Sequence, residues 1–185
     1  MPPVTRPAFT LTVVTSADGF IAPGPDEPPH LWASPEEQAL FFADIEAADW
    51  AVMGRRTHAV ADRPDRYRIV FSAAAGAGEW RRPTQLWIDP ARVGPADLPG
   101  LVAHVRPLRT GLILGGTRVH DWFLGHGAVD RVHLTEEPVS FGTGLPLFTG
   151  ASGSAAGTLR RLGFALRSSR DLNAAGTVHS VWTPG

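Results

Sequence analysis

The segment GLILGGTRVHDWFLGHGAVDRVHLT, residues 111–135, contains an apolar run, two glycines, a helical pattern and a second apolar run. This succession predicts a strand over 111–114, a helix over 117–124 and a strand over 129–135. Strands joined through a helix lie parallel in one sheet, because the helix carries the chain back across a sheet face. The segment therefore predicts an α/β fold.

The same alternation extends over most of the chain. A strand-like run opens residues 9–22 and breaks at Asp18-Gly19, and Ser34 then precedes a proline and two acids, as at a helix start. Apolar residues follow Ser34 at helical spacing. Further strands are predicted over 49–54, 67–72 and 84–89, helices after Gly54 and over 94–105, a glycine-rich connection over 141–157, and a hairpin over 161–183. The pattern predicts a mostly parallel central sheet with helices on both faces and a C-terminal antiparallel hairpin.

Length and charge limit the classes of protein to consider. With 185 residues and 43% hydrophobic content, residues 1–185 are expected to form a single domain with a sizeable core. A net charge of −1 with scattered basic residues gives no nucleic-acid footprint, and the apolar runs are too short to span a membrane. The N-terminus lacks the apolar stretch of a secretory signal, which favours a cytoplasmic location.

Two residue types are missing. The chain has no cysteine, which excludes thiol catalysis, disulfides and cysteine-ligated metals. It also has no lysine, since all 17 basic residues are arginine. This excludes a Walker P-loop and a Schiff-base lysine. The seven histidines show no paired ligand spacing, so no metal site is predicted. Any phosphate must be held by arginines and backbone amides.

Phosphate-binding features occur at two strand ends. Gly115-Gly116 leaves backbone N–H groups bare at the start of a helix, where phosphates bind, although a tight turn would also use glycine. In MGRRT, residues 53–57, two arginines follow a strand-end glycine, and Ser72 ends another strand. The arginines could equally be solvated surface charge. Two such strand ends in one sheet indicate a ligand with several phosphates, such as a dinucleotide, although no GxGxxG motif is present.

These segments resemble a known family. AVMGRRT, IVFS and LILGGTRVHDWF…DRVHLT are similar to the cofactor-binding segments of dihydrofolate reductase and of the riboflavin-pathway reductase domains (RibD C-terminal type). TSADGFIA and FGTGLPLF resemble the riboflavin-type branch. The resemblance implies a three-layer dihydrofolate reductase-like fold with NADPH as hydride donor. It assigns the adenosine 2′-phosphate and the pyrophosphate to Arg55, Arg56, Thr57 and Ser72. The pyrophosphate and nicotinamide side falls to Gly115, Gly116, Thr117, Arg118 and Val119, with His120 where the folate branch has a tyrosine.

The substrate side is also implied. Trp32, Glu37 and Phe41 reproduce a folate-reductase spacing, and Thr135 matches the threonine that bonds the acid in that family. A carboxylate in a cofactor cleft can grip an amidine-like edge and favour protonation of the neighbouring ring nitrogen, which makes the C=N carbon a better hydride acceptor. Phe41 would pack on the flat ring. Alone, Glu37 could simply satisfy a helix start.

The substrate is open at this point. Arg66 stands six residues before Ser72, as does the folate-reductase arginine that pairs with the substrate's glutamate tail, but it could be an ordinary loop arginine. Phe20 and Leu114 replace a lysine and a glutamate of the riboflavin branch. The sequence predicts an NADPH-dependent reductase of a small heterocycle: a dihydrofolate, pterin or pyrimidine. The alternatives are a riboflavin-type phosphoribosyl-aminopyrimidine reductase and a non-catalytic dinucleotide-binding protein. A homodimer is compatible with the sequence.

Overall fold

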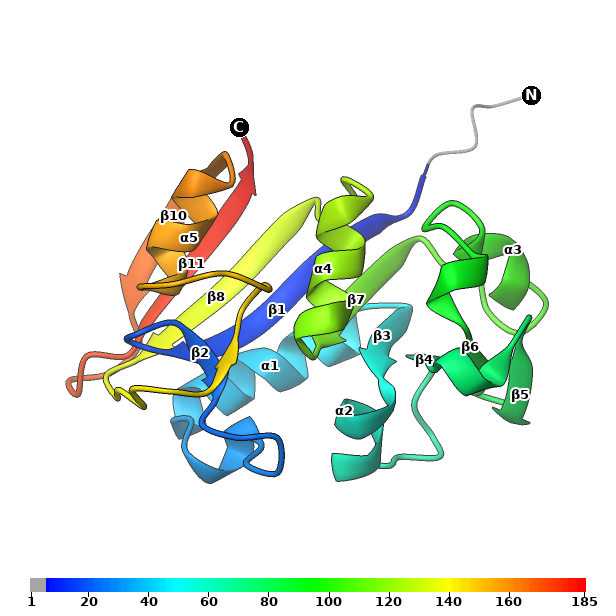
Figure 1. Cartoon of the computed structure of the whole chain (residues 1–185), viewed down its shortest axis with the longest axis horizontal. Helices are drawn as coiled ribbons and strands as arrows, with labels where there is room; N and C mark the ends of the chain where they lie inside the picture. The colour runs from blue at the N-terminus through cyan, green and yellow to red at the C-terminus, as the bar shows by residue number, and fades with distance from the viewer. Residues whose placement is uncertain (1–5) are drawn as a thin grey trace.

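A mixed sheet forms the centre of the molecule. The computed structural model describes residues 6–185. The prediction about a secretory signal, which was drawn from the N-terminus, therefore rests partly on residues outside this range. Within that range, nine strands form one sheet in the order β10-β11-β8-β1-β7-β3-β4-β6-β5 (Figure 1). The six parallel strands are β8 (Arg131–Glu137), β1 (Ala8–Ser16), β7 (Thr110–Gly115), β3 (Trp50–Gly54), β4 (Arg68–Phe71) and β6 (Gln85–Ile88). The antiparallel strands at the edges are β10 (Phe164–Asp171), β11 (Val178–Pro184) and β5 (Glu79–Arg82). This confirms the mostly parallel sheet and its closing hairpin.

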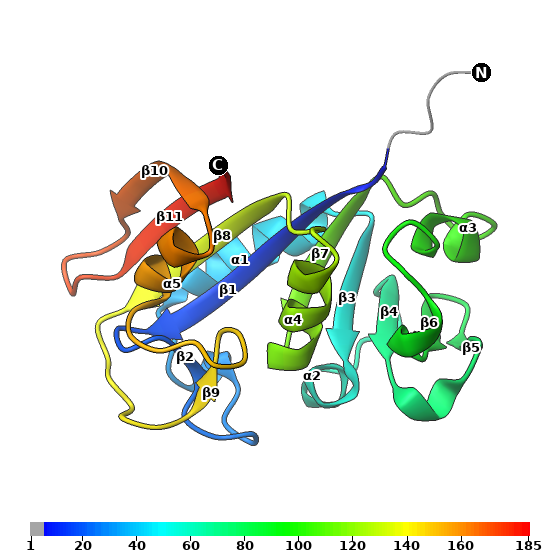
Figure 2. The same cartoon turned by 45° about the horizontal axis from the view of Figure 1, so that its top comes forward.

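Helices cover both faces of this sheet. α1 (Pro35–Ala47) lies behind β1 and β8, whereas α4 (Thr117–Gly125) and α5 (Ala155–Arg161) lie in front of the sheet (Figures 1 and 2). α2 (Arg55–Val60) directly follows β3, and α3 (Leu98–Val102) precedes β7. A second, small sheet pairs β2 (Phe20–Ala22) with β9 (Leu145–Pro146). The predicted three-layer architecture is therefore confirmed.

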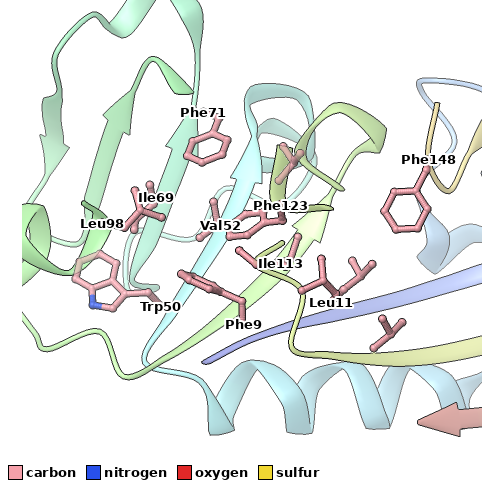
Figure 3. Packing of buried hydrophobic residues seen from close by; sticks show 14 of the residues in the cluster. Phe9, Leu11, Trp50, Val52, Ile69, Phe71, Leu98, Ile113, Phe123 and Phe148 are labelled. Carbon is pink, nitrogen blue, oxygen red and sulfur yellow. The ribbon is translucent and has the colours of Figure 1, made fainter. Parts of the chain in front are cut away.

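The main hydrophobic core lies between the sheet and the helices in front of it. It joins strand residues such as Ile69 and Ile113 with Phe123 of α4, all fully buried (Figure 3). Leu159 of α5 is also fully buried in this core. Side chains alternate along β1: Leu11 packs in this core, whereas the Thr12 hydroxyl donates to Asp44 of α1 at 2.7 Å. The two faces of the sheet thus differ, one apolar and one partly polar.

α1 docks on the sheet in an unusual way. Ser34 caps the helix as the sequence indicates, accepting a hydrogen bond from the Glu37 N–H at 3.3 Å. The apolar residues that follow at helical spacing are not its buried face, because Glu37 is the one buried residue of the helix within the described chain. Asp44 instead anchors the helix, bonding Thr12 and His133 of the sheet. Phe41, Phe42 and Ile45 of α1 line a cleft.

Three parts of the sequence prediction are corrected by the structure. The small residues after β4 lead into a further strand, β5, at the edge of the sheet. Its sequence EWRR is largely exposed and charged, so it lacks the apolar pattern that predicts a strand. The connection over 141–157 is not wholly irregular, because it contains β9 and the start of α5. α5 begins there because Ser154 caps it, accepting from the Gly157 N–H at 3.1 Å. The strand expected over 129–135 lies at 131–137.

Candidate active site

A cleft of about 1360 Å³ lies between α1 and α2, over the neighbouring strands β7, β3 and β4. The loops at the carboxyl ends of these strands reach it, where ligands bind in open α/β sheets. Most of the site residues inferred from the sequence line this cleft: Glu37, Phe41, Arg55, Arg56, Thr57, Arg66, Ser72, Gly116, Thr117, Arg118, Val119 and His120. Gly115, Trp32 and Thr135 do not line it.

The two glycines after β7 have different surroundings. Gly115 has φ +99°, and a Cβ atom there would lie 2.9 Å from Nε2 of His120. A Cβ atom on Gly116 would meet no atom within 4 Å. The peptide bond between the two glycines is cis. Thr117 starts α4 and donates its hydroxyl to the Pro146 carbonyl at 2.6 Å. Gly115 therefore needs to be glycine for the protein's own packing, whereas Gly116 presents bare backbone to the cleft.

Three arginines at this end of the cleft have no carboxylate partner among residues 6–185. Arg55 and Arg56 begin α2 and are exposed, and Arg118 is exposed in the first turn of α4. None of the three takes part in an ion pair or side-chain hydrogen bond within that range. Guanidinium groups and bare amides are the donors that phosphate oxygens prefer. The bare backbone of Gly116 and the three arginines thus fit a ligand with several phosphates.

His120 is a buried neutral group beside the glycine pair. It is 1% exposed, and burial lowers its pKa to about 4. Its Nδ1 lies 2.8 Å from the carbonyl oxygen of Leu147, which can only accept, so Nδ1 carries the proton. Nε2 is then an acceptor, and no described residue donates to it. The Nε2 atom is itself enclosed and faces Gly115, so His120 packs behind the glycine pair.

Among residues 6–185, Glu37 is the one carboxyl group that is both buried and lines the cleft. It is 7% exposed, and its carboxyl group forms no hydrogen bond with any residue of the described chain. Burial raises the pKa of Glu37 to about 7, and the charges of Glu137 and Asp44 add to the effect. A carboxyl group with this pKa holds or releases a proton near neutral pH, which suits acid–base chemistry.

The two neighbouring carboxylates are held by hydrogen bonds. Glu137 accepts from the Ser34 N–H at 2.7 Å and from the Thr177 hydroxyl at 2.6 Å. Burial would raise the pKa of Asp44, but hydrogen bonds from His133, at 2.9 Å, and from Thr12 outweigh it, so the pKa is lowered. Asp44 therefore keeps its negative charge near Glu37.

Neither Trp32 nor Thr135 forms a hydrogen bond with Glu37 in the described structure. Trp32 packs edge-on against Phe141 with ring centroids 5.0 Å apart, and its buried Nε1 has no partner among the described residues. The Thr135 hydroxyl lies 3.1 Å from Nδ1 of His179. The predicted hydrogen bond of Thr135 with the acid is thus absent from the described structure, in which the hydroxyl lies against His179 of β11 instead.

Sequence reasoning missed the polar layer beneath α1, formed by Asp44, His133, Glu137 and His179. A signal for it exists. His133, Thr135 and Glu137 alternate along β8, which places them on one face of the sheet, and Asp44 lies two helical turns after Glu37. Arg66 does line the cleft, but its Nη1 lies 2.5 Å from Oε1 of Glu46 on α1.

Comparison with known proteins finds structural relatives. No protein-family model and no curated protein matches the sequence. A protein of Shewanella sp. PV-4 assigned to riboflavin biosynthesis is 20% identical, with 95% of this chain and 98% of that one covered and a TM-score of 0.69. A diaminohydroxyphosphoribosylaminopyrimidine deaminase/5-amino-6-(5-phosphoribosylamino)uracil reductase of Thermotoga maritima is 15% identical, at a TM-score of 0.72. There 97% of this chain is covered, but it spans only 57% of the Thermotoga protein.

Dihydrofolate reductase of Enterococcus faecalis, solved with NADP(H) and RAB-propyl, is 15% identical, with 96% of both chains covered and a TM-score of 0.64. At these identities the likeness establishes the fold. The chain has the dihydrofolate reductase-like fold that these proteins share, and the fold implied by the resemblance in the sequence is confirmed. Over residues 6–185, no helix is long and apolar enough to cross a membrane, and no three His, Asp or Glu side chains are placed to hold a metal ion.

Proposed function

We propose that the protein is an NADPH-dependent reductase that transfers a hydride to the C=N carbon of a planar heterocycle, such as a dihydrofolate, a pterin or a related pyrimidine. The observation that carries this proposal is Glu37, a buried carboxyl group without a hydrogen-bond partner in the described chain, facing a large cleft. A protein that only stores a dinucleotide has no use for such a group, because an unsatisfied buried carboxyl costs folding free energy.

Glu37 would hold the heterocycle and control its proton. Its carboxylate accepts two hydrogen bonds from an N–C–NH₂ edge, and it shares a proton with the adjacent ring nitrogen. One proton, held between Glu37 and the bound heterocycle, reaches the nitrogen of the reduced C=N bond through the ring system or a water molecule as the carbon of that bond gains the hydride, so the C=N bond becomes CH–NH and charge is balanced. NADPH supplies the hydride when bound. Phe41, one helical turn after Glu37, packs against the flat ring, and Asp44 helps to keep the proton affinity of Glu37 high.

The cofactor would lie along the other end of the cleft. Arg55, Arg56, Thr57 and Ser72 would hold the 2′-phosphate and part of the pyrophosphate. Gly116, Thr117, Arg118 and Val119 would hold the pyrophosphate and lead toward the nicotinamide, and His120 lines the cleft beside them. Gly115, which does not line the cleft, would shape the turn that exposes Gly116. The unpaired arginines and the open surface of Gly116 support this assignment. The Enterococcus dihydrofolate reductase, solved with NADP(H), is a precedent for a nicotinamide cofactor bound to a protein of this fold.

A riboflavin-type activity is the second candidate. The Thermotoga relative is named as a reductase of 5-amino-6-(5-phosphoribosylamino)uracil. In this chain the strand before the glycine pair ends in Leu114, an apolar residue that lines the cleft, where that branch has a glutamate. The third candidate is a dinucleotide-binding protein without catalysis.

The proposal is tested by adding NADPH to the purified protein and measuring energy transfer from the tryptophans to the bound dihydronicotinamide. NADPH absorbance is then followed with dihydrofolate, dihydrobiopterin, simple cyclic imines and the phosphoribosyl-aminopyrimidine. Consumption with a pterin or folate supports the first candidate, and consumption with the phosphoribosyl compound alone supports the second. NADPH binding without consumption of any of them would leave the non-catalytic protein.

A further inference from the structure

Glu137, the last residue of β8, is a buried carboxyl group joined to the start of α1. It is 4% exposed and forms no ion pair with any cationic side chain among residues 6–185. One of its oxygens accepts from the Ser34 N–H at 2.7 Å. Ser34 in turn caps α1, because its hydroxyl accepts from the Glu37 N–H at 3.3 Å. A single residue therefore links Glu137 to the helical turn that carries Glu37.

The turn between β10 and β11 holds Glu137 from the other side. The Thr177 hydroxyl donates to the second oxygen of Glu137 at 2.6 Å and accepts from Nδ2 of Asn173 at 2.9 Å. Oδ1 of Asn173 accepts from the Thr177 N–H at 3.1 Å, which closes the turn. Because the hydroxyl proton of Thr177 is committed to Glu137, both oxygens of Glu137 are acceptors, as in an ionised carboxylate.

The donors to Glu137 differ from those to Asp44, the other acid near Glu37. Asp44 is bonded to His133, which can carry a positive charge, whereas Glu137 receives its hydrogen bonds from neutral groups. Neutral donors stabilise a carboxylate without cancelling its charge. Burial is the main cause of the raised pKa of Glu37, and the charge of Glu137 adds more to it than that of Asp44.

Other titratable side chains also surround this carboxyl group. They are the exposed Glu36 on α1, His133 on β8, His179 on β11, and Glu27 and His30 in the loop that lines the cleft. None of these is a cause of the raised pKa of Glu37.

We propose that Glu137 is a positioning residue of the reaction, which holds the first turn of α1 in place and keeps an uncancelled negative charge beneath Glu37. The inference rests on the proposed reductase function and deepens it. Glu137, Asn173 and Thr177 do not line the cleft, so the turn of the C-terminal hairpin would support the chemistry without touching cofactor or substrate.

The first test follows Glu37 itself and needs no turnover. The carboxyl carbons of the glutamates are labelled with ¹³C, the Glu37 signal is assigned by its loss in Glu37→Gln, and its titration is recorded by NMR. Glu137→Gln keeps the shape and removes the charge, so the pKa of Glu37 should fall by roughly one pH unit. Glu136→Gln is the matched control, because Glu136 precedes Glu137 on β8 and faces the opposite side of the sheet. It should leave the pKa of Glu37 unchanged.

The second test follows the reaction with NADPH and the best heterocycle. In Glu137→Gln the fall of kcat/KM above about pH 7 should move to lower pH by the same amount, so that kcat/KM at pH 8 drops by about tenfold. The affinity for NADPH should not change. Thr177→Val removes the hydroxyl that holds Glu137 and should lower kcat several-fold, whereas Thr177→Ser keeps the hydroxyl and should retain most of the native kcat.

The outcomes are distinct. A native pKa of Glu37 in Glu137→Gln would overturn the inference, and so would an equal fall of that pKa in Glu136→Gln or a native kcat in Thr177→Val. In each of these cases the native protein still reduces its heterocycle, so the proposed function stands. If the native protein binds NADPH but consumes it with no heterocycle, the reductase proposal fails. The inference, as a statement about the reaction, then fails with it even where Glu37 titrates as expected.

Discussion

At the scale of single residues, Glu37 is expected to cost the protein stability. The folded protein raises the pKa of this carboxyl group from 4.5 to about 7, so it holds the proton more tightly than the unfolded chain does. The free energy of unfolding must therefore fall as the pH rises from about 4.5 to about 7, and the loss is complete above that window. A shift of this size corresponds to roughly 3 kcal/mol.

The change that tests this is Glu37→Gln, which keeps the shape and removes the titration. In urea unfolding between about pH 5 and about pH 8, the free energy of unfolding of the variant should rise relative to that of the native protein as the pH rises, by up to roughly 3 kcal/mol. Glu36→Gln is the control, since Glu36 is the exposed neighbour in the same helical turn and should show no such gain. A constant difference between Glu37→Gln and the native protein across this range would show that Glu37 is not desolvated.

At the scale of elements, the two glycines between β7 and α4 have different roles: Gly115 is needed for the protein's own packing, and Gly116 belongs to the proposed cofactor site. Gly116→Ala adds a methyl group where the protein itself has open space, so the free energy of unfolding should change by less than about 1 kcal/mol. NADPH binding should weaken by roughly 10-fold or more, because the methyl group occupies the place of the phosphate. Both are measured on one sample, by urea unfolding and by tryptophan energy transfer. Unchanged NADPH affinity would remove Gly116 from the proposed cofactor site.

The start of α2 is expected to distinguish the two nicotinamide cofactors. If Arg55 and Arg56 hold the 2′-phosphate, each charged hydrogen bond contributes about 1.5–3 kcal/mol, or roughly 10- to 150-fold in affinity for NADPH over NADH. Replacing both arginines with alanine should remove most of this preference and leave NADH affinity nearly unchanged. Titration of both cofactors against both proteins measures it. A native protein that binds NADH as tightly as NADPH would contradict the assignment.

The elements also show what the sequence could predict. The capped start of α1, the parallel strands and the hairpin turn at Asn173 follow from local rules, and the structure has them. Local rules did not predict which face of α1 is buried, because the sheet face beneath this helix is polar. Asp44 and His133 lie 89 residues apart, and no local pattern pairs them. The edge strand β5 was missed because its side chains are largely exposed and charged, so it has no core-facing pattern.

At the scale of the whole molecule, the order of the strands assembles the site. β3, which ends at Gly54, and β7, which begins at Thr110, are neighbours although β4, β5 and β6 lie between them in the sequence. This pairing brings the ends of both strands to one cleft. The sequence predicted that the two strand ends serve one ligand, which requires that parallel strands end at the same edge of the sheet. It could not predict that Thr135 would contact His179, since that contact needs the antiparallel pairing of β11 with β8. The position of the proposed cofactor residues at one cleft was thus easier to predict than the surroundings of Glu37.

The most direct test of the central claim is the pH dependence of kcat/KM, measured with NADPH and the best heterocycle for the native protein and for Glu37→Gln. Because the pair of Glu37 and substrate must carry one proton, the native kcat/KM should fall about tenfold per pH unit above about pH 7. Glu37→Gln should lower turnover by roughly 10²–10⁴-fold, lose this pH dependence and still bind NADPH normally. Near-native turnover in Glu37→Gln, with the pH profile unchanged, would contradict the account.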